Sequence, residues 1–353
     1  MSDKEANFEK KVLIIRMLNT AEVVSIGLPA IRFFQQGVPD AEIHFLTFSQ
    51  GGKLISIAEP SVTVHCLPAE QWPDNFFLAM ESFLGLAEQI IAQQYSQIVN
   101  LDTAFMPCFL SRFLKDALEP VSGNYLNTSV KQLLSQVEDQ SLQADYVNSA
   151  DSYLASSFMG MYKWQHNSWH YAPMPDGGYP EYYLSHCCGL DVSNVPVTIK
   201  VTPDKRLRKE AKTSKVVALC LSQSDDDYVY PHTVELKKAL QALGYYVWLE
   251  SEAKEDLTTL LKMLATSDLM IAKPSALRWY AQSVDCATLL ITAGANPAIY
   301  MPDFATDATE RCLRHGQSES PSRLSETQPC SCDLPQDLAE SVSSIFEHLA
   351  EEQ

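Results

Sequence analysis

The sequence predicts an α/β protein of two domains, each a parallel sheet covered by helices. Three observations predict this class. Short apolar runs rich in β-branched residues, such as Val12–Ile15 and Val216–Leu221, are too short for helices and are typical of buried parallel strands. Amphipathic stretches at helical spacing follow most of these runs, which is the alternation of βαβ units. A chain of 353 residues is long for a single core.

The opening stretch begins this alternation. A strand over Val12–Ile15 is followed by the polar break Asn19–Glu22 and then by apolar residues at helical spacing. Asn19 or Thr20 can cap this helix, and Glu22 stands in its first turn. Ligands of doubly wound sheets bind at the carboxyl ends of the strands, so Glu22 is placed at the mouth of a site. A carboxylate that merely starts the helix is the alternative, which the local sequence favours.

The same alternation continues through most of the chain and divides it into domains. We expect an N-terminal Rossmann-like domain over residues 1–195 with an aromatic-rich insertion at about 123–195, a C-terminal domain over 196–335, and a helix over 336–353 that crosses back to the N-terminal domain. The further strands are expected at Ala41–Phe48, Val62–Leu67, Gln97–Leu101, Tyr245–Leu249, Asp268–Ala272 and Ala287–Thr292, and the further helices from Gly51 and over Phe76–Gln94, Pro231–Leu243, Glu255–Ala265 and Leu338–Leu349.

The middle of the chain, from about Gly123 to Asp204, lacks this alternation. Its Pro and Gly residues indicate loops, and it is dense in aromatic and histidine residues such as Trp164, Trp169 and His170. Such a loop can form a sugar platform or an acceptor-binding lid. It can equally be the packed underside of a connection between the domains.

The charge of the chain argues against several classes of partner. With 26 Lys and Arg against 44 Asp and Glu, the net charge of −18 argues against nucleic acid and against more than a peripheral contact with an anionic membrane. The N-terminal stretch MSDKEANFEKK has no apolar signal-peptide core, and no run is long enough to span a bilayer. We therefore expect a cytoplasmic protein without a transmembrane segment.

Four segments together resemble the family 9 glycosyltransferases, which are the bacterial heptosyltransferases and their relatives. KVLIIRMLNTAEVVSIGLPAIRFFQQGVPDAEIHFL resembles the family's opening strand, R-x-S-S-x-G-D loop, helix and second strand, and YSQIVNLD is similar to its strand ending in Asp-Leu-Gln. CCGLDVSNVPVTIKVTPD resembles the passage between domains. LLKMLATSDLMIAKPSALRWYAQSVDCATLLITAGANP resembles the region that ends in a donor-binding loop and helix. The resemblance implies the GT-B architecture, with two Rossmann-like domains facing across a cleft.

The resemblance also implies a catalytic residue. The family's Gly-Asp pair falls on Ala21-Glu22, and the Asp of that pair is expected to act as the general base toward the acceptor hydroxyl. Glu22 keeps the carboxylate and extends it by one methylene. A displacement of about 1 Å can cost on the order of a hundredfold in rate, so this substitution requires a compensating shift. Glu22 is the candidate base.

On the donor side, the resemblance implies a nucleotide-binding loop after the first strand of the second domain. Ser222 and Ser224 supply its hydroxyl groups, whereas Tyr228 stands where the family has a lysine. The run Asp225–Asp227 places further carboxylates beside the expected diphosphate, which is electrostatically adverse without a cation. Glu252 stands where a ribose-binding carboxylate is expected, and a plain surface carboxylate is the alternative.

The family's donor loop, Asn-Asp-Ser-Gly-x-x-His, falls on Lys273–Trp279. The Asp is replaced by Pro274 and the His by Trp279. A helix N-terminus with a serine and neighbouring cations still suits a diphosphate, and Lys273 or Arg278 can take over the role of the missing lysine. The donor-binding candidates in this loop are Lys273, Ser275, Ala276 and Arg278.

Three cysteines near the C-terminus stand where some relatives carry a cysteine cluster. Cys312, Cys330 and Cys332 supply three soft ligands, one short of a closed tetrahedral site, and His315 is the fourth candidate. Unliganded surface thiols are the more common explanation, so we expect no firm metal site and no cofactor beyond the donor substrate.

Taken with the resemblance, the sequence predicts an inverting glycosyltransferase. It would move a sugar, with a heptose from an ADP-heptose-like nucleotide diphosphate as the leading candidate, to a hydroxyl of a saccharide or protein. The family's usual acceptor belongs to lipopolysaccharide, and a net charge of −18 fits a lipid-anchored acceptor poorly. The alternatives are a degenerate relative that binds a nucleotide sugar or a partner as a scaffold, and a GT-B-like epimerase or other nucleotide-sugar enzyme.

Overall fold

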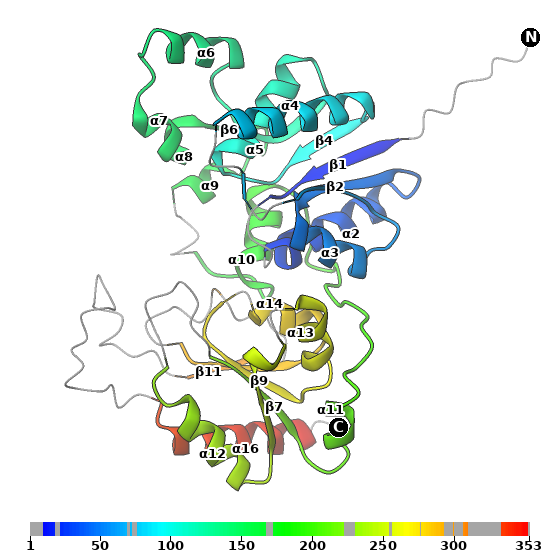
Figure 1. The fold of residues 1–353 in the computed structure, drawn as a ribbon, viewed down its shortest axis with the longest axis vertical. Coiled ribbons are helices and arrows are strands. Elements are labelled where there is room, and N and C mark those ends of the chain that lie inside the picture. The colour runs from blue at the N-terminus through cyan, green and yellow to red at the C-terminus, as the bar shows by residue number, and fades with distance from the viewer. Residues whose placement is uncertain are drawn as a thin grey trace, which may run out of the picture. The chain divides into compact units, whose positions relative to one another are not determined.

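The fold is described from a computed structural model, shown in Figure 1. The chain divides into two compact units, one of residues 1–175 and 179–197 and the other of residues 176–178 and 198–353. Each unit is described by itself. The structure describes residues 10–17, 22–68, 71–72, 76–166, 172–221, 230–253, 256–275, 277–292, 299, 306–309 and 333–351.

The N-terminal unit contains a six-stranded sheet in the order β3-β2-β1-β4-β5-β6. The first five strands are parallel, and β6 pairs antiparallel with β5. Because β1 pairs with β2 on one side and β4 on the other, the strand order reverses at β1. The strands are β1 (Lys11–Ile15), β2 (Glu42–Phe48), β3 (Thr63–Leu67), β4 (Gln97–Asn100), β5 (Val121–Leu126) and β6 (Leu154–Ser156).

Helices connect these strands as the alternation predicts. The first connection begins with a π-helical turn, η1 (Val23–Gly27), and continues as α2 (Leu28–Gly37), whereas an ordinary α-helix was expected there. The turn is fully buried, so tertiary packing rather than local propensity selects its widened geometry. The other helices between the parallel strands are α3 (Ser49–Ala58), α4 (Phe76–Ala92) and α5 (Phe105–Asp116).

The middle of the chain is more regular than predicted. It includes the end of β5, the antiparallel edge strand β6 and a second π-helical turn, η3 (Tyr182–Cys187), where loops were expected. Tyr182 and Tyr183 of this turn are buried, and Trp164 packs edge-on against Tyr183 with ring centroids 4.7 Å apart. These aromatics are therefore packed, whereas Trp169 and His170 lie outside the described residues. The short helices are α6 (Val130–Glu138), α7 (Ala144–Asn148), α8 (Ala150–Tyr153), α9 (Tyr162–Gln165) and α10 (Gly178–Glu181).

The C-terminal unit contains a five-stranded parallel sheet in the order β11-β10-β9-β7-β8. Its order reverses at β7, which pairs with β8 and β9. The short strand β11 lies in a stretch that was expected to be irregular. The strands are β7 (Val216–Cys220), β8 (Tyr246–Leu249), β9 (Leu269–Ala272), β10 (Ala287–Leu290) and β11 (Thr306–Ala308), and the helices are α11 (Leu207–Glu210), α12 (Thr233–Ala242), the 3₁₀ turn η4 (Glu250–Ala253), α13 (Leu257–Leu264), α14 (Leu277–Ser283) and α16 (Pro335–Glu351).

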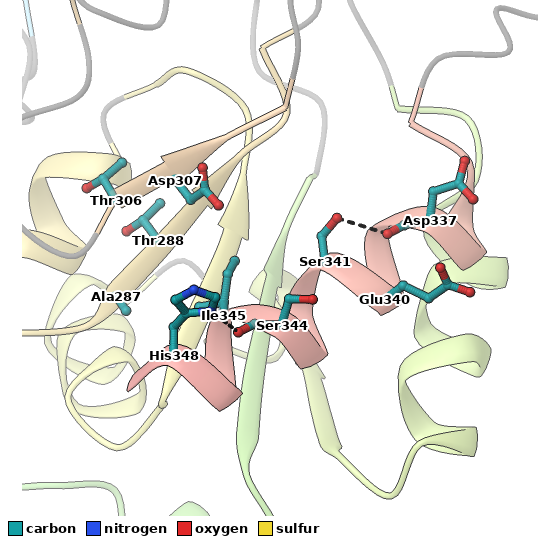
Figure 2. Close-up of a pocket in the computed structure, with 10 residues that line it drawn as sticks. All are labelled: Ala287, Thr288, Thr306, Asp307, Asp337, Glu340, Ser341, Ser344, Ile345 and His348. Carbon is teal, nitrogen blue, oxygen red and sulfur yellow. Dashed lines mark hydrogen bonds between the residues drawn. The ribbon is translucent and has the colours of Figure 1, made fainter. Parts of the chain in front are cut away.

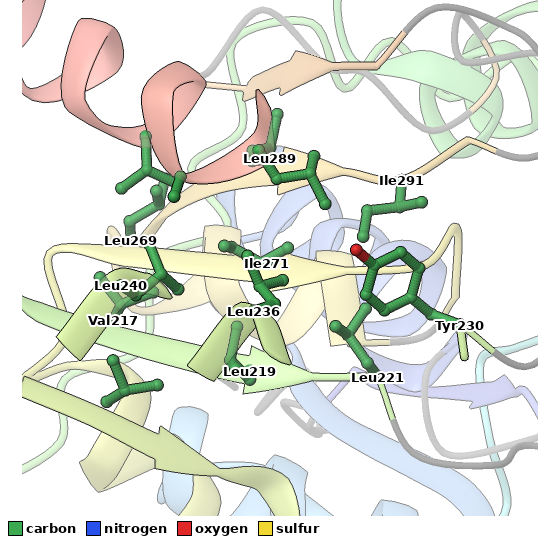
Figure 3. Close-up of a cluster of buried hydrophobic side chains, with 14 of the residues drawn as sticks. Val217, Leu219, Leu221, Tyr230, Leu236, Leu240, Leu269, Ile271, Leu289 and Ile291 are labelled. Carbon is green, nitrogen blue, oxygen red and sulfur yellow. The ribbon is translucent and has the colours of Figure 1, made fainter. Parts of the chain in front are cut away.

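The last helix, α16, belongs to the core of this unit (Figure 3). Its residues Leu338, Val342 and Phe346 are buried in one cluster with alternate residues of β7, β9 and β10 and with α12. The return of this helix to the N-terminal domain, expected from the sequence, is therefore not observed. Its amphipathic pattern was correctly predicted, but the pattern does not specify which sheet the helix covers.

Candidate functional site

The carboxyl ends of β1 and β4 carry a buried polar cluster. The two strands lie side by side where the strand order of the N-terminal sheet reverses, which is the usual ligand position in a doubly wound sheet. Arg16 follows β1 directly, and Asp102 lies two residues beyond β4. Both side chains are buried although both are charged, so their charges must be compensated within the protein.

Arg16 supplies that compensation by contacting two carboxylates at once. Its Nη2 atom is paired with the carboxylate of Glu22, and its Nη1 atom lies 3.3 Å from Oδ1 of Asp102. Nη1 also donates a 2.6 Å hydrogen bond to the carbonyl oxygen of Leu101, while the backbone N–H of Met17 donates to Asp102. Burial alone lowers the pKa of Arg16, but the two carboxylates outweigh it and raise the pKa above its ordinary value. The guanidinium is therefore permanently charged.

Tyr183 closes the cluster from the η3 turn. Its hydroxyl donates a 2.6 Å hydrogen bond to the carbonyl oxygen of Leu101 and accepts one of 3.3 Å from the Asn124 side chain. The Arg16 guanidinium carbon lies 5.4 Å from the centre of the Tyr183 ring. Burial raises the pKa of Tyr183 well above its ordinary value, so this phenol stays neutral and acts as a hydrogen-bonding group.

Glu22 is the member of the cluster that reaches solvent. It is the N-cap residue of η1, and its side chain keeps 21% of its surface exposed, against 3% for Arg16 and none for Asp102. The carboxylate is paired with Arg16, and the partial exposure of the side chain suits contact with a ligand. Asn19 and Thr20, the expected caps, and Ala21 lie outside the described residues.

The corresponding position in the C-terminal unit is the end of β7 and β9, where the strand order reverses again. Lys273 follows β9 directly and is buried, with 5% of its surface exposed. Ser275 accepts a 3.4 Å hydrogen bond from the backbone N–H of Leu277 at the start of α14. The loop that follows β7, with Ser222 and Ser224, lies outside the described residues, as does Ala276.

Two other predicted donor-binding residues are engaged within the protein. Arg278 is fully buried in α14, its guanidinium carbon lies 5.8 Å from the centre of a Trp279 ring, and burial lowers its pKa to about 10. Glu252 accepts hydrogen bonds of 3.0 Å from the backbone N–H of Leu249 and from Arg206. Arg278 therefore has no surface to offer a ligand in this conformation, and Glu252 would have to exchange partners.

No protein-family model and no curated protein matches this sequence, whereas solved structures match it over nearly its whole length. A family 9 glycosyltransferase from Veillonella parvula superimposes with a TM-score of 0.63, at 12% identity over 98% of each chain. The E. coli ADP-heptose lipopolysaccharide heptosyltransferase II gives a TM-score of 0.59, at 14% identity over 97% of this chain and all of that one. E. coli heptosyltransferase WaaC with ADP gives 0.53, at 12% identity over 96% and 99%. The chain has the GT-B fold of the heptosyltransferases.

The sequence predicted Glu22, Lys273 and Ser275 as site residues, and all three follow strands that pair at the reversal points of their sheets. It missed Arg16, Asn124 and Tyr183 as parts of the N-terminal cluster. An arginine directly after a buried apolar strand is a readable signal for a buried ion pair, and Asp102 ends a recognised segment. Tyr183 carries no such signal, because only the fold brings η3 to the end of β1.

A groove of about 690 Å³ in the C-terminal unit lies elsewhere, between the sheet edge and α16 (Figure 2). Thr288 and Thr306 line it from the beginnings of β10 and β11, so it is at the amino ends of these strands. Asp307, Asp337 and Glu340 give it an acidic lining. Both its position and its charge are unsuited to a nucleotide diphosphate.

Two expected absences concern metals and membranes. The cysteine set Cys312, Cys330 and Cys332 and the neighbouring His315 lie outside the described residues. Within the described ranges, no group of three or more His, Cys, Asp and Glu side chains is placed to hold a metal ion. Among the helices that the structure describes, none combines the length and apolar character that crossing a bilayer requires.

Proposed function

We propose that this protein is a glycosyltransferase that moves a sugar from a nucleotide diphosphate donor to an acceptor hydroxyl. The observation that carries the proposal is the partly exposed Glu22 carboxylate at the point where the N-terminal sheet reverses, within a fold shared with heptosyltransferases. The E. coli structures with this fold include one bound to ADP and one bound to ADP-2-deoxy-2-fluoro heptose. An ADP-heptose-like donor and a saccharide or protein acceptor are the corresponding substrate classes.

In the proposed reaction, Glu22 takes the proton of the acceptor hydroxyl. The hydroxyl oxygen attacks the anomeric carbon of the donor, the bond from that carbon to the diphosphate oxygen breaks, and the nucleotide diphosphate leaves with the electron pair. The anomeric configuration inverts because the attack occurs opposite the leaving group. General bases of this kind contribute about 10²–10⁴ in rate.

The proposed donor set lies in the C-terminal unit. Lys273 and Ser275 follow β9. Ser222, Ser224 and Ala276, which the sequence assigns to the same set, lie outside the described residues. A cation and hydroxyl groups at this position stabilise a departing diphosphate electrostatically. Arg278, buried in α14, contributes through its charge and packing, and Glu252 contacts the ribose once Arg206 releases it.

One observation favours a second function, that of a catalytically inactive binder of a nucleotide sugar or of a partner protein. The Glu22 carboxylate is ion-paired with Arg16. A proton moved onto Glu22 during transfer would neutralise its charge and weaken this ion pair, which opposes the role of base. The altered family positions at Ala21, Tyr228, Pro274 and Trp279 point in the same direction.

Calorimetry with ADP-heptose and other nucleotide sugars, followed by an assay of donor hydrolysis and transfer, separates these functions. Wild-type protein and Glu22→Gln are compared. A transferase binds the donor and turns it over. The Glu22→Gln variant carries an amide that cannot accept the proton, so its rate should be about 10²–10⁴-fold lower while binding is retained. Glu59→Gln is the matched control, because Glu59 is also paired with an arginine, Arg32 at 2.7 Å, outside the cluster. Its activity should equal that of the wild type.

Tight binding without turnover, unchanged by Glu22→Gln, would exclude the transferase and support the binder. If neither nucleotides nor nucleotide sugars bind, the transferase and the nucleotide-sugar binder are both excluded, and binding of a partner protein is left.

A further inference from the structure

A second buried polar cluster lies at the opposite, amino end of the N-terminal sheet. It joins His44 of β2, His65 of β3 and Tyr95, which stands just before β4. Nδ1 of His44 lies 3.0 Å from Nε2 of His65 and 2.7 Å from the Tyr95 hydroxyl, and that hydroxyl lies 3.0 Å from Nε2 of His65. Three donor atoms from three segments therefore converge on one point.

Hydrogen bonds alone satisfy this triangle incompletely. Each imidazole nitrogen is either a donor or an acceptor, and the Tyr95 hydroxyl has one hydrogen. If both nitrogens are acceptors, the hydroxyl can donate to one of them only. If one nitrogen carries a hydrogen, that single hydrogen has to serve both contacts of this nitrogen, the one with the other nitrogen and the one with the hydroxyl oxygen. At least one of the three short contacts is therefore not a full hydrogen bond in any protonation state of neutral rings.

A small cation satisfies all three atoms together. Zinc binds imidazole nitrogen and oxygen ligands at about 2.0–2.2 Å. The observed triangle has sides of 2.7, 3.0 and 3.0 Å. A point about 2.05 Å from each corner lies about 1.2 Å outside the plane of the three atoms, so an ion can sit at bonding distance from all of them. Tetrahedral angles require donors about 3.3 Å apart, so the donors would move apart by roughly 0.3–0.7 Å when the ion binds. A fourth position on the far side of the ion is left for water.

The surroundings of His44 match those of a metal-binding histidine. Its other ring nitrogen, Nε2, lies 2.8 Å from Oε1 of Glu42, and this proximity lowers the pKa of the Glu42 carboxyl. The two groups are close but not aligned as a hydrogen bond, so the carboxylate favours a proton on Nε2 through its charge, which leaves Nδ1 as the unprotonated nitrogen. Histidine ligands of metals characteristically have such a carboxylate partner on the second nitrogen, which sets the tautomer.

The cluster is also built in advance and accessible. β2 and β3 pair in a parallel register that aligns His44 with Thr63, so His44 and His65 stand on the same face of the sheet. His44 and Tyr95 are buried, whereas His65 is half-buried and gives an ion a path from solvent.

We propose that His44, His65 and Tyr95 form a binding site for a divalent transition-metal ion of the zinc class, with Glu42 orienting His44. Imidazole ligands select zinc, copper and nickel over magnesium and calcium. The site lies at the end of the sheet opposite Glu22, so the ion joins β2, β3 and the segment before β4 and has no part in the transfer reaction. The proposal is independent of the proposed function.

Zinc binding to the full chain tests the proposal. The protein is stripped with EDTA, exchanged into metal-free buffer and titrated with zinc in a calorimeter. The background carries Cys312→Ser, Cys330→Ser and Cys332→Ser, which removes the other candidate ligands. We expect one zinc ion per chain, a higher Tm with zinc, and loss of measurable binding in His44→Gln and in His65→Gln. Glu42→Gln should weaken binding about 10–100-fold.

Cys66→Ser is the matched control, because Cys66 adjoins His65 but faces Gly52 of α3 on the other side of the strand. It should bind zinc as its parent does. With copper in place of zinc, a tyrosinate-to-copper absorption band should appear and be absent in Tyr95→Phe. Circular dichroism verifies that each variant is folded. If His44→Gln does not fold, zinc binding to His65→Gln decides, because His65 is half-buried. Less than one zinc ion per chain, or binding unchanged by His65→Gln, would overturn the proposal and leave a hydrogen-bonded cluster only.

Discussion

The N-terminal and C-terminal sheets share one arrangement, in which the first strand, β1 or β7, pairs with neighbours on both sides. The side chains that follow these strands differ in charge. After β1 and β4, two carboxylates, Glu22 and Asp102, share the single guanidinium of Arg16. After β9, the first side chain is the cation Lys273. Among the described side chains, one topology thus places two carboxylates around one guanidinium at one reversal point and a lysine at the other.

This difference matches the two tasks of a transfer reaction. A carboxylate with part of its surface exposed suits the side that accepts a proton, and a lysine with a neighbouring hydroxyl suits the side that receives a diphosphate. Each charge is maintained differently. Glu22 depends on a buried arginine that a second carboxylate also holds, so the N-terminal site should be the more sensitive to a single substitution.

Replacing Arg16 by methionine should have the largest effect. The change leaves the buried Asp102 without its cation and Glu22 without its ion pair, and breaking a buried pair in this way costs about 3–5 kcal/mol. Chemical denaturation measures the free energy of unfolding. Arg112→Gln is the control, because Arg112 is only partly buried and pairs with Asp116 one turn away on the same helix, where a pair contributes less than about 1 kcal/mol. Equal losses in the two variants would contradict the compensating role of Arg16.

Replacing Gly123 by alanine tests the backbone that supports the N-terminal site. Gly123 has φ of +87°, and an added Cβ would overlap the carbonyl oxygen of Asn100 on β4. We expect a loss of about 2–4 kcal/mol from left-handed backbone strain together with this clash. Gly244 has the same φ in the C-terminal unit, but its Cβ would meet nothing within 4 Å. Gly244→Ala should therefore cost only about 1 kcal/mol in the same denaturation experiment.

At the reversal point of the C-terminal sheet, Lys273→Met should weaken donor binding. A hydrogen bond to a charged group contributes about 1.5–3 kcal/mol, which is roughly 10–150-fold in Kd for ADP or ADP-heptose. Calorimetry gives Kd, and circular dichroism verifies that the variant is folded. Glu22→Gln should leave the same Kd almost unchanged. A Kd that responds to Glu22→Gln and not to Lys273→Met would reverse the assignment of the two sides.

The smallest effect concerns an ordinary carboxylate of the C-terminal unit. Asp256 caps α13 by accepting hydrogen bonds from Thr259, which lower the pKa of its carboxyl. Because the pKa is lower in the folded state, this stabilisation is present above the unfolded pKa of about 3.9 and is lost as the pH falls through the folded value. Asp256→Ala should cost about 1 kcal/mol at pH 7, and the pH-dependent part of this difference should disappear in acid. Asp256→Asn keeps the cap and should show little loss at either pH.

Most of the strands were predictable because β-branched runs buried on both faces carry a strong local signal, whereas β5, β6 and β11 were not expected. Val12–Ile15 and Val216–Leu221 illustrate it. The π-helical turns were not predictable, since burial of η1 and η3 selects that geometry. In the site, Glu22 was identified from its position after a strand. Arg16, the ion-pair partner of Glu22, lies over the ring of Tyr183, which is 167 residues further along the chain, and no local pattern relates these two residues.

The place of α16 in the C-terminal core has a consequence for synthesis of the chain. The apolar face that Leu338, Val342 and Phe346 cover is already present once β10 has been made, yet about fifty residues separate Ile291 from Leu338. At about 5–20 residues per second, that face waits roughly 2–10 s on the ribosome for its last helix. During that interval the uncovered apolar face is a surface on which the nascent chain can aggregate or bind a chaperone.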